Sequence, residues 1–326
     1  MTDEYGRNID YLRISVTDRC NLRCVYCMPP EGVESCSHDK VLRYEEIMRI
    51  VRAAALCGIK HIRLTGGEPT VRRGIVSLVK DIHDTPGIES VSMTTNGVIL
   101  SEMLPDLTAA GLSGVNISID TLDPDRFDEI TRRTGNLPKV LEAIDASVAA
   151  GLNTKVNCVA MKGVNDDELA CIAALAENRP ICVRFIEFMP IGKNDFKKAV
   201  QADEIIDVLT KAYGKPMPDG TRRGNGPARY YKFPGLEGPV GIISAMTHEF
   251  CEECNRIRLT SDGFLKLCLQ YDVGESLREL VRAGASEEEL AAEMKQTVMK
   301  KPQHHTFNDY ADKPDIEERA MSSIGG

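Results

Sequence analysis

The sequence predicts an α/β fold in which parallel strands alternate with crossover helices. Two observations predict it: short β-rich runs recur six times between about residues 10 and 190, and stretches between them carry apolar residues at helical spacing. Repeated strand-then-helix units require parallel strands with helical crossovers. This pattern fits either an open sheet or an incomplete barrel, and periodicity alone does not distinguish them.

The predicted elements follow one another along the chain in that order. Strands are expected at residues 12–16, 61–65, 90–94, 114–119, 154–160 and 182–188, and helices at 44–57, 74–83, 138–150 and 166–177. Past residue 190 a Gly/Pro-rich stretch, residues 214–241, leads into short strands. Asp262-Gly263, between 257–260 and 264–267, is typical of a tight hairpin turn. We therefore expect two regions, 1–190 and 191–326, with the second packed on the first.

Composition excludes several classes of protein. The 326 residues carry 40 Lys and Arg against 49 Asp and Glu, a net charge of −9, which argues against a generally basic nucleic-acid-binding protein. No apolar run approaches the ~18 residues of a membrane span, and the N-terminus lacks the apolar core of a signal peptide. We expect a cytoplasmic protein without a membrane partner. Eleven cysteines, an odd number, cannot all pair in a disulfide framework.

Three cysteines directly follow the first predicted strand. Cys20, Cys24 and Cys27 form a CxxxCxxC motif at the carboxyl end of that strand, where parallel sheets present their ligands. Three thiolates can hold three corners of a four-iron cube and leave one iron open to a cofactor or substrate. The alternative is a structural zinc site with a fourth ligand, for which His38 is the nearest histidine.

Three more cysteines lie near the predicted hairpin. Cys251, Cys254 and Cys268 come together because the hairpin turn folds the chain back, although zinc held with His248 is again an alternative. Arg256 and Arg258 follow Cys254 and face one side of a strand, an arrangement suited to phosphate or carboxylate. No P-loop motif is present in the sequence. The pair His304-His305 is more typical of a protein surface than of a metal site.

The second predicted strand ends in Gly66-Gly67-Glu68-Pro69. Together with CxxxCxxC, this motif resembles the radical S-adenosylmethionine (SAM) superfamily. The resemblance implies an incomplete (βα)6 TIM-like barrel, whose mouth is closed by a C-terminal region of short antiparallel strands and helices. It also implies a 4Fe-4S cluster on the first three cysteines. SAM would then contact residues near the strand ends: Tyr26, Gly66, Gly67, Glu68, Ser118 and Met189.

Further motifs narrow the resemblance. Residues 226–230 (GPARY), the run CxxCNRIR with its later cysteine, and the terminal Gly325-Gly326 make residues 5–326 similar to the GTP 3′,8-cyclase (MoaA) family of molybdenum cofactor biosynthesis. That family forms 3′,8-cyclo-7,8-dihydro-GTP through a 5′-deoxyadenosyl radical, and its second 4Fe-4S cluster would lie on Cys251, Cys254 and Cys268. The implied GTP contacts are Arg13, Arg63, Thr94, Lys155, Arg256, Ile257 and Arg258. Arg13, Arg256, Arg258, Gly325 and Gly326 would be catalytic, the glycines in a tail that enters the site.

The resemblance also implies partners, and other functions remain open at this point. An electron donor would reduce the enzyme, and a cyclic pyranopterin monophosphate synthase would take the product. The oligomeric state is open, a homodimer being one option. The first alternative function is a radical SAM enzyme with an auxiliary cluster that modifies a peptide. The second is a zinc-stabilised binding protein without catalysis.

Overall fold

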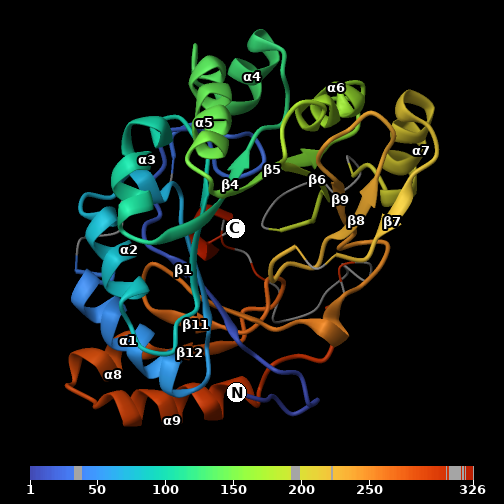
Figure 1. Ribbon diagram of the computed structural model, residues 1–326. Coiled ribbons are helices and arrows are strands. Elements are labelled where there is room, and N and C mark those ends of the chain that lie inside the picture. Colours follow the sequence, from blue (N-terminus) through green and yellow to red (C-terminus); the bar gives the residue numbers. More distant parts are fainter. Residues whose placement is uncertain are drawn as a thin grey trace.

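The computed structural model describes residues 1–32, 39–191, 199–221, 223–305, 307, 317, 319 and 321–325. Its centre is a twelve-stranded sheet with the order β12-β11-β10-β1-β2-β3-β4-β5-β6-β9-β8-β7 (Figure 1). The central strands all run parallel: β1 (Tyr11–Ser15), β2 (His61–Thr65), β3 (Ser90–Thr95), β4 (Leu112–Ser118), β5 (Asn153–Ala160) and β6 (Cys182–Glu187). The order is linear, so the sheet forms an incomplete barrel. This confirms the predicted fold class.

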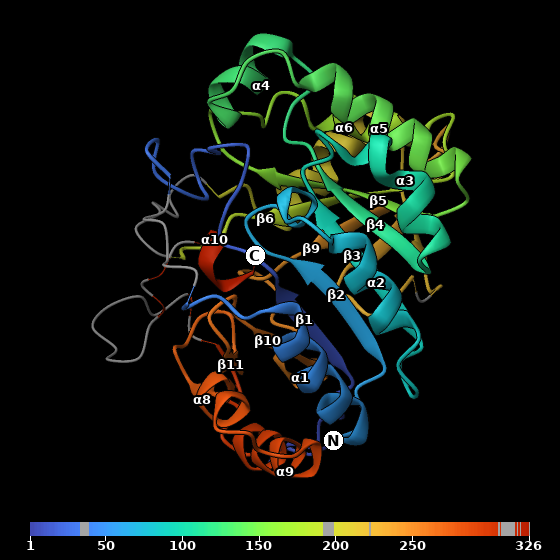
Figure 2. The same ribbon diagram turned by 90° about the vertical axis from the view of Figure 1, so that its left-hand side faces the viewer.

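Helices cover the outer face of the central strands (Figure 2). They are α1 (Tyr44–Leu56), α2 (Ile75–His83), α3 (Leu100–Ala109), α4 (Pro124–Thr131), α5 (Leu137–Ala149) and α6 (Leu169–Ala173), with 3-10 turns η1 (Pro69–Val71) and η2 (Ala174–Ala176). Two of these helices, α3 and α4, were not predicted. Pro105 interrupts the helical pattern of α3, and α4 is a short, polar helix that begins at the cap Asp123.

The second half of the chain extends the sheet at both ends. β9 (Val240–Ile243) pairs in parallel with β6, and β10 (Arg256–Leu259) pairs in parallel with β1. The expectation of antiparallel strands in this region therefore holds for these two on one side only, because β9 pairs antiparallel with β8 and β10 with β11. It holds for the outer strands β7 (Met217–Asp219), β8 (Arg229–Lys232), β11 (Phe264–Lys266) and β12 (Gly274–Ser276). The predicted hairpin joins β10 to β11.

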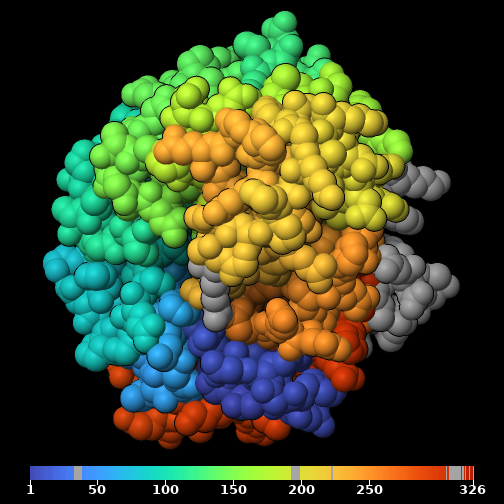
Figure 3. Space-filling view, turned by 45° about the vertical axis from the view of Figure 1, so that its right-hand side comes forward, coloured from blue at the N-terminus to red at the C-terminus, as the bar shows by residue number. Residues whose placement is uncertain are grey.

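The remaining helices lie around these added strands. They are α7 (Ala202–Tyr213), α8 (Leu277–Arg282), α9 (Glu287–Val298), the 3-10 turn η4 (Cys251–Glu253) and α10 (Met321–Ile324). α8 and α9 lie beside α1, as Figure 2 shows. In Figure 3, yellow and orange residues of the second half cover one face of the molecule above the blue N-terminal residues. Among the described helices, none is long and apolar enough to span a membrane.

A single large apolar core lies between the sheet and its helices, and it sets which side chains remain for the interior of the barrel. Leu12, Ile14, Ile62 and Leu64 on β1 and β2 are fully buried in this core. Successive side chains of a strand alternate between faces, so the residues between them point to the other side of the sheet. On β1, β2 and β10 those residues include arginines, which places charge inside the barrel. The predicted boundary at residue 190 stays a prediction.

Candidate functional site

The first cysteine triad lies in the loop that leaves β1. The sulfur of Cys20 accepts hydrogen bonds from the backbone N–H of Leu22 (3.3 Å) and from Nδ2 of Asn96 (3.7 Å). Burial raises the pKa of Cys20 to about 11, and burial together with the nearby Cys20 raises the pKa of Cys27 to about 12. Such thiols stay protonated until a cation replaces the proton, which is the behaviour expected of metal ligands. His38, the nearest histidine for the zinc alternative, lies outside the described residues.

The two glycines after β2 allow two loops to pack together. A Cβ at Gly66 would stand 2.5 Å from the carbonyl oxygen of Thr17, and one at Gly67 would stand 2.2 Å from that of Arg19. Instead, Gly67 N–H donates to Thr17 (2.6 Å) and Glu68 N–H donates to Arg19 (2.8 Å). The motif therefore fastens the end of β2 to the loop that carries the first triad.

Glu68 connects that motif to the next strand. Its buried carboxylate accepts hydrogen bonds from Oγ1 of Thr70 (2.5 Å), Oγ1 of Thr95 (2.7 Å) and the backbone N–H of Asn96 (2.7 Å). Burial raises the pKa of Glu68, and these hydrogen bonds oppose the rise. Because Asn96 in turn reaches Cys20, Glu68 positions the surroundings of the first triad.

A small cavity beside the first triad brings together two of the predicted SAM contacts, Tyr26 and Ser118. Cys24, Tyr26, Asn96, Ser118 and Asp120 are among the residues that line it. The hydroxyl of Tyr26 donates to Oδ2 of Asp120 at 2.7 Å. Burial raises the pKa of Asp120 to about 6, although hydrogen bonds from the Val159 N–H and from Tyr26 oppose the rise. The cavity thus offers hydroxyl, amide and carboxyl groups at the carboxyl ends of β1, β3 and β4.

Met189, also predicted near SAM, is not among the residues that line this cavity. It lies against a small apolar cluster of Ile191, Phe307 and Ile324, apart from the main core. Its neighbours therefore come from the C-terminal part of the chain rather than from the cavity beside the first triad.

The barrel interior gathers positive charge. Arg13 on β1 is in register with Arg63 on β2 and with Arg258 on β10, so the three side chains share one face. Burial lowers the pKa of Arg13 well below its usual value, and the neighbouring charges of Arg258, Arg63 and Arg256 lower it further. The pKa of Arg258 is lowered to about 10, chiefly by burial and next by the positive charge of Arg256. An anion bound among these side chains would offset both the burial of their charges and the repulsion between them.

The same interior continues across the sheet to Lys155 on β5. Burial lowers the pKa of Lys155 to about 8, with Arg184 and Arg63 adding to the effect, and its Nζ donates to the carbonyl of Arg223 (2.6 Å). Oγ1 of Thr94 on β3 is buried without a hydrogen-bond partner among the described residues. A buried polar atom in that state is a strong indication of a missing ligand.

Ile257 lies differently from the other predicted substrate residues. Its side chain is fully buried in the apolar core, on the face of β10 opposite to Arg256 and Arg258. Only its main chain is available to the interior of the barrel.

Arg184 lies in this interior and was not predicted, whereas Arg223 reaches it through its main-chain carbonyl and pairs its side chain with Asp219. Arg184 on β6 is 4% exposed, donates to Oδ1 of Asn157 (2.9 Å) and faces Lys155 and Arg63. Its signal in the sequence is a single charge within the apolar run 182–186. Arg223 comes from the loop before β8, which has no motif that marks it.

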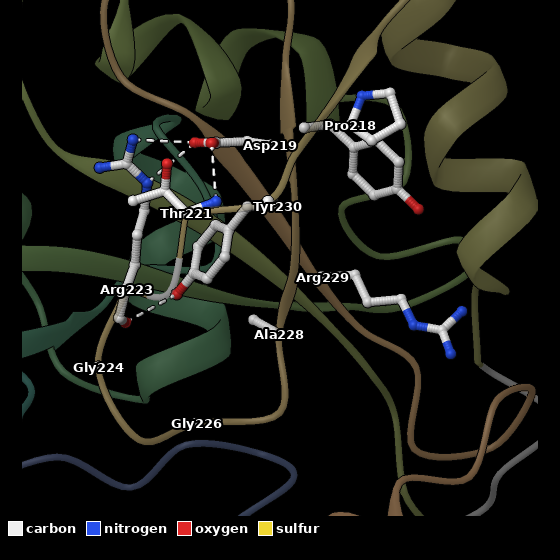
Figure 4. Close-up of a pocket in the computed structure, with 11 residues that line it drawn as sticks. Pro218, Asp219, Thr221, Arg223, Gly224, Gly226, Ala228, Arg229 and Tyr230 are labelled. Atoms are coloured by element: carbon white, nitrogen blue, oxygen red, sulfur yellow. Dashed lines mark hydrogen bonds and ion pairs between the residues drawn. The ribbon is translucent and has the colours of Figure 1, made fainter.

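Arg223 also borders a surface pocket of about 370 Å³ between β7 and β8. Figure 4 shows Arg223 paired with Asp219 (2.9 Å) on one side of it, while Arg229 points away from that pair. The motif at residues 226–230 therefore lines this surface pocket. The pocket adjoins the part of the barrel interior where Lys155 lies, because Lys155 binds the carbonyl of Arg223.

The second triad lies between η4 and the end of β11. Arg7 donates to the carbonyl of Cys251 (2.9 Å), and Lys301 donates to the carbonyl of Arg256 (2.9 Å), so two buried cations hold this segment. Burial would raise the pKa of Cys254, but Arg256, Lys301 and Arg7 outweigh it and lower the pKa to about 6. The surroundings of this triad therefore favour a thiolate.

In the part of the chain that the structure describes, neither cysteine triad brings its three sulfurs within 4.8 Å of one another. Zinc–sulfur bonds of about 2.3 Å at tetrahedral angles would bring the sulfurs within about 3.8 Å of one another. Among the described residues, the one group of three ligand atoms within 4.8 Å consists of Glu249, Cys251 and His304. It shares Cys251 with the second triad and does not include His248. A four-iron cube binds each cysteine through a different iron, so wider spacing suits it.

The C-terminal segment lies against Arg258, against the end of β2 and against the first triad. The carbonyl of Gly325 accepts a hydrogen bond from Nη1 of Arg258 at 2.8 Å. A Cβ at Gly325 would stand 2.7 Å from Oγ1 of Thr65 at the end of β2. The backbone N–H of Ser322 approaches the sulfur of Cys27 and lowers its pKa slightly against the effect of burial. Gly326 lies outside the described residues.

Comparisons with known proteins agree with this arrangement. The model of the radical SAM superfamily matches residues 14–176, and a model described as Molybdenum Cofactor Synthesis C matches residues 181–307. A protein named GTP 3′,8-cyclase from Clostridium perfringens (strain SM101 / Type A) is 46% identical over 327 residues, covering all of both chains. One of the same name from Pelotomaculum thermopropionicum is 48% identical over 332 residues, again covering both chains completely.

Solved structures show the same fold at low sequence identity. Streptococcus suis SuiB bound to S-adenosylmethionine superposes with a TM-score of 0.63 at 14% identity, over 94% of this chain and 75% of SuiB. At that identity the likeness concerns the fold alone.

Proposed function

This chain belongs to the radical SAM superfamily and to its GTP 3′,8-cyclase family, and from that premise we propose how its residues bind and transform GTP. It is an enzyme that converts GTP to 3′,8-cyclo-7,8-dihydro-GTP in molybdenum cofactor biosynthesis, using SAM and an iron–sulfur cluster. The alternative of a peptide-modifying enzyme is not favoured, since the full-length relatives carry the cyclase name. A non-catalytic zinc protein is not supported either.

In this proposal the first triad holds the cluster, and SAM binds beside it at the carboxyl ends of the strands. Cys20, Cys24 and Cys27 ligate the cluster, while Tyr26 and Ser118, which line the small cavity together with Cys24, border SAM. Gly66, Gly67 and Glu68 hold the neighbouring loops, and Met189 closes the site next to the C-terminal segment. When bound, SAM and the reduced cluster supply a 5′-deoxyadenosyl radical that removes the C3′ hydrogen of GTP.

GTP lies in the cationic interior of the barrel, and the convergence of buried cations is the observation that carries this assignment. A nucleoside triphosphate brings about four negative charges, which the arginines and lysine of this interior would offset. Arg13 and Arg63 lie at the centre of the sheet, and Lys155 and Arg184 lie toward its β6 side. Thr94 supplies the buried hydroxyl that awaits a partner. The cations bind the phosphates and exclude water around them.

A second 4Fe-4S cluster on Cys251, Cys254 and Cys268 faces the base of GTP in this proposal. Support comes from the wide spacing of the thiols, from the thiolate-favouring charges around Cys254, and from Arg256 and Arg258 on the adjacent strand. The two arginines orient the nucleotide between the two triads. The main chain of Gly325, which Gly326 follows in the sequence, lies against Arg258 and carries no side chain. In this proposal, a larger residue at position 325 would occupy the space of the substrate.

The remaining partners follow from the reaction rather than from the fold. Reducing the first cluster takes one electron per turnover, so we propose an external electron donor. A cyclic pyranopterin monophosphate synthase acts on the product. The homodimer and the cytoplasmic location stay predictions, as does the division into residues 1–190 for the radical SAM barrel and 191–326 for the second cluster and substrate site.

One experiment tests the proposal as a whole. Anaerobic protein given GTP, SAM and a low-potential reductant should form 5′-deoxyadenosine and cyclised GTP in equal amounts, and ATP in place of GTP should give no cyclised product. SAM cleavage that is unchanged without GTP, with no nucleotide product, would reject the assignment.

A further inference from the structure

A buried ion pair joins the β11 hairpin to the C-terminal segment. Nζ of Lys266 lies 2.5 Å from Oε2 of Glu317, and the two side chains are 0% and 2% exposed. Lys266 also donates to the carbonyl of Tyr271. An ion pair this far from solvent is unusual, because removing either partner leaves a buried charge without compensation. Glu317 therefore either remains on Lys266 or leaves the protein interior together with its backbone.

Further contacts fasten the same segment. The backbone N–H of Glu317 donates to the carbonyl of Gln270 at 2.7 Å. Arg319 donates through Nε to Oε1 of Glu317 (2.9 Å), pairs with Asp272 (2.5 Å) and lies over the ring of Phe264. Main chain and side chains thus bind the segment to β11 and to the loop that follows it.

Lys266 and the active-site arginine that holds the chain end are direct neighbours. In the antiparallel pairing of β10 with β11, Arg258 is in register with Lys266. Arg258 binds the carbonyl of Gly325, and Lys266 binds Glu317, so one cross-strand pair holds the segment at two points eight residues apart. Between them, Ile324 packs with Ile191 and Phe307. Figure 2 shows α10 lying over the barrel beside these strands.

We propose that Lys266 and Glu317 are positioning residues that latch the C-terminal segment, so that Gly325 reaches Arg258 within the substrate site. They touch no reacting group themselves and act through the chain end. This inference rests on the proposed function, since it assigns the chain end a part in the reaction on GTP. Without the latch, Arg258 loses its carbonyl partner and the chamber opens toward solvent.

The test compares Glu317→Gln with wild type in the cluster-loaded protein. Gln has the size of Glu but no charge, so it should release the segment without creating a cavity. We expect a carboxypeptidase to shorten the variant at least tenfold faster, as followed by intact mass. We also expect the ratio of cyclised GTP to 5′-deoxyadenosine to fall at least fivefold, with iron content and SAM binding unchanged. Glu317→Asp keeps the charge, so it should recover part of the protection from carboxypeptidase and part of the ratio of cyclised GTP to 5′-deoxyadenosine.

Glu275→Gln serves as the matched control. Glu275 lies on the neighbouring β12 and forms an exposed ion pair with Lys300 (2.5 Å), so its loss should change neither readout. Should Glu317→Gln fold poorly, Lys266→Met removes the pair from the other side and should give the same faster shortening. A Glu317→Gln or Lys266→Met protein with the protection and the product ratio of wild type would overturn the latch. Wild type that makes no cyclised GTP would instead reject the proposed function, because the shortening assay does not depend on turnover.

Discussion

The carbonyl of Gly325 accepts a hydrogen bond from Nη1 of Arg258, a residue 67 positions earlier on β10. The same arginine is in register with Arg13 on β1, which is itself in register with Arg63 on β2. One end of the chain thus completes a row of buried cations that begins near the other end. Substitutions along this row should separate nucleotide binding from SAM chemistry.

Gly325→Ala should impair the reaction without unloading the clusters. The new methyl group would meet Oγ1 of Thr65 at 2.7 Å, and the backbone φ of 70° is one that alanine rarely adopts. We expect at least a tenfold loss of cyclised GTP with unchanged iron content. Gly284→Ala is the control, because its φ is also positive (90°) but its Cβ would meet nothing within 4 Å. Equal activity in both variants would contradict a role for Gly325.

Arg258→Ala should weaken the use of GTP more than the binding of SAM. It removes a buried cation and the partner of the Gly325 carbonyl, so we expect the dissociation constant of GTP to rise at least tenfold. Calorimetry with GTP and separately with SAM distinguishes the two effects. Arg73→Ala, at an exposed position, should leave both affinities unchanged. Unchanged GTP affinity and turnover in Arg258→Ala would show that the substrate lies elsewhere.

GTP affinity should depend on pH through Lys155. Burial and the neighbouring arginines lower its pKa to about 8, and a bound triphosphate raises it again, so binding takes up a proton near that pH. Affinity is then greatest below pH 8 and falls about tenfold between pH 7 and pH 9. Lys155→Arg stays charged over this pH range, so its GTP affinity should fall less steeply with pH than that of wild type. Identical slopes for wild type and Lys155→Arg, measured without SAM, would contradict the assignment.

The two triads should contribute iron independently. If each holds a four-iron cluster, anaerobically reconstituted wild type contains about eight iron atoms per chain, and Cys254→Ala about four. Cys24→Ala should also retain about four but should abolish SAM cleavage, since the first triad serves SAM. Cys171→Ala, at an exposed cysteine outside both triads, should keep the wild-type iron content. About four iron atoms in wild type would exclude the second cluster.

Glu46 should make stability depend on acid pH. Burial alone would raise its pKa, but hydrogen bonds from Arg282 and Arg43 outweigh it and lower the pKa to about 2. In the unfolded chain the pKa of Glu46 is near 4.5. Because folding lowers this pKa, the ionised carboxylate stabilises the fold fully at pH values above 4.5, and the stabilisation is lost as the pH falls toward 2. Glu46→Gln should cost about 3 kcal/mol at pH 7 in denaturant unfolding and less at pH 4. Glu89→Gln, in the exposed pair with Lys60, should leave the free energy of unfolding almost unchanged, because solvent screens that pair.

The central strands were predictable because each is a short apolar run between turn residues. The observed β2 spans the predicted residues 61–65, and the other five differ at their ends by one or two residues. Local patterning could not reveal which strands the second half would pair with. β10 pairs with β1 although more than 240 positions separate them in the sequence. This pairing is determined by burial and register and not by local sequence.

The same distinction applies to the site. Cysteine spacing and the Arg256/Arg258 pair are local signals, and they lead to the two triads and one side of the cationic interior. Arg184 and Lys266 have no motif around them, and their importance comes from neighbours distant in sequence. The glycines at 66 and 67 were predicted as SAM contacts, and the sequence did not reveal that they also allow the close approach of the loop of Thr17 and Arg19.

The parallel pairing of β10 with β1 also bears on the order of events during synthesis. A ribosome releases β1 early, yet the edge it offers to β10 stays open until more than 240 further residues have emerged. The contact of Gly325 with Arg258 forms only with the last residues of the chain. A nascent or truncated polypeptide therefore lacks a closed chamber, and the shielding of the substrate site is completed only with the C-terminal segment.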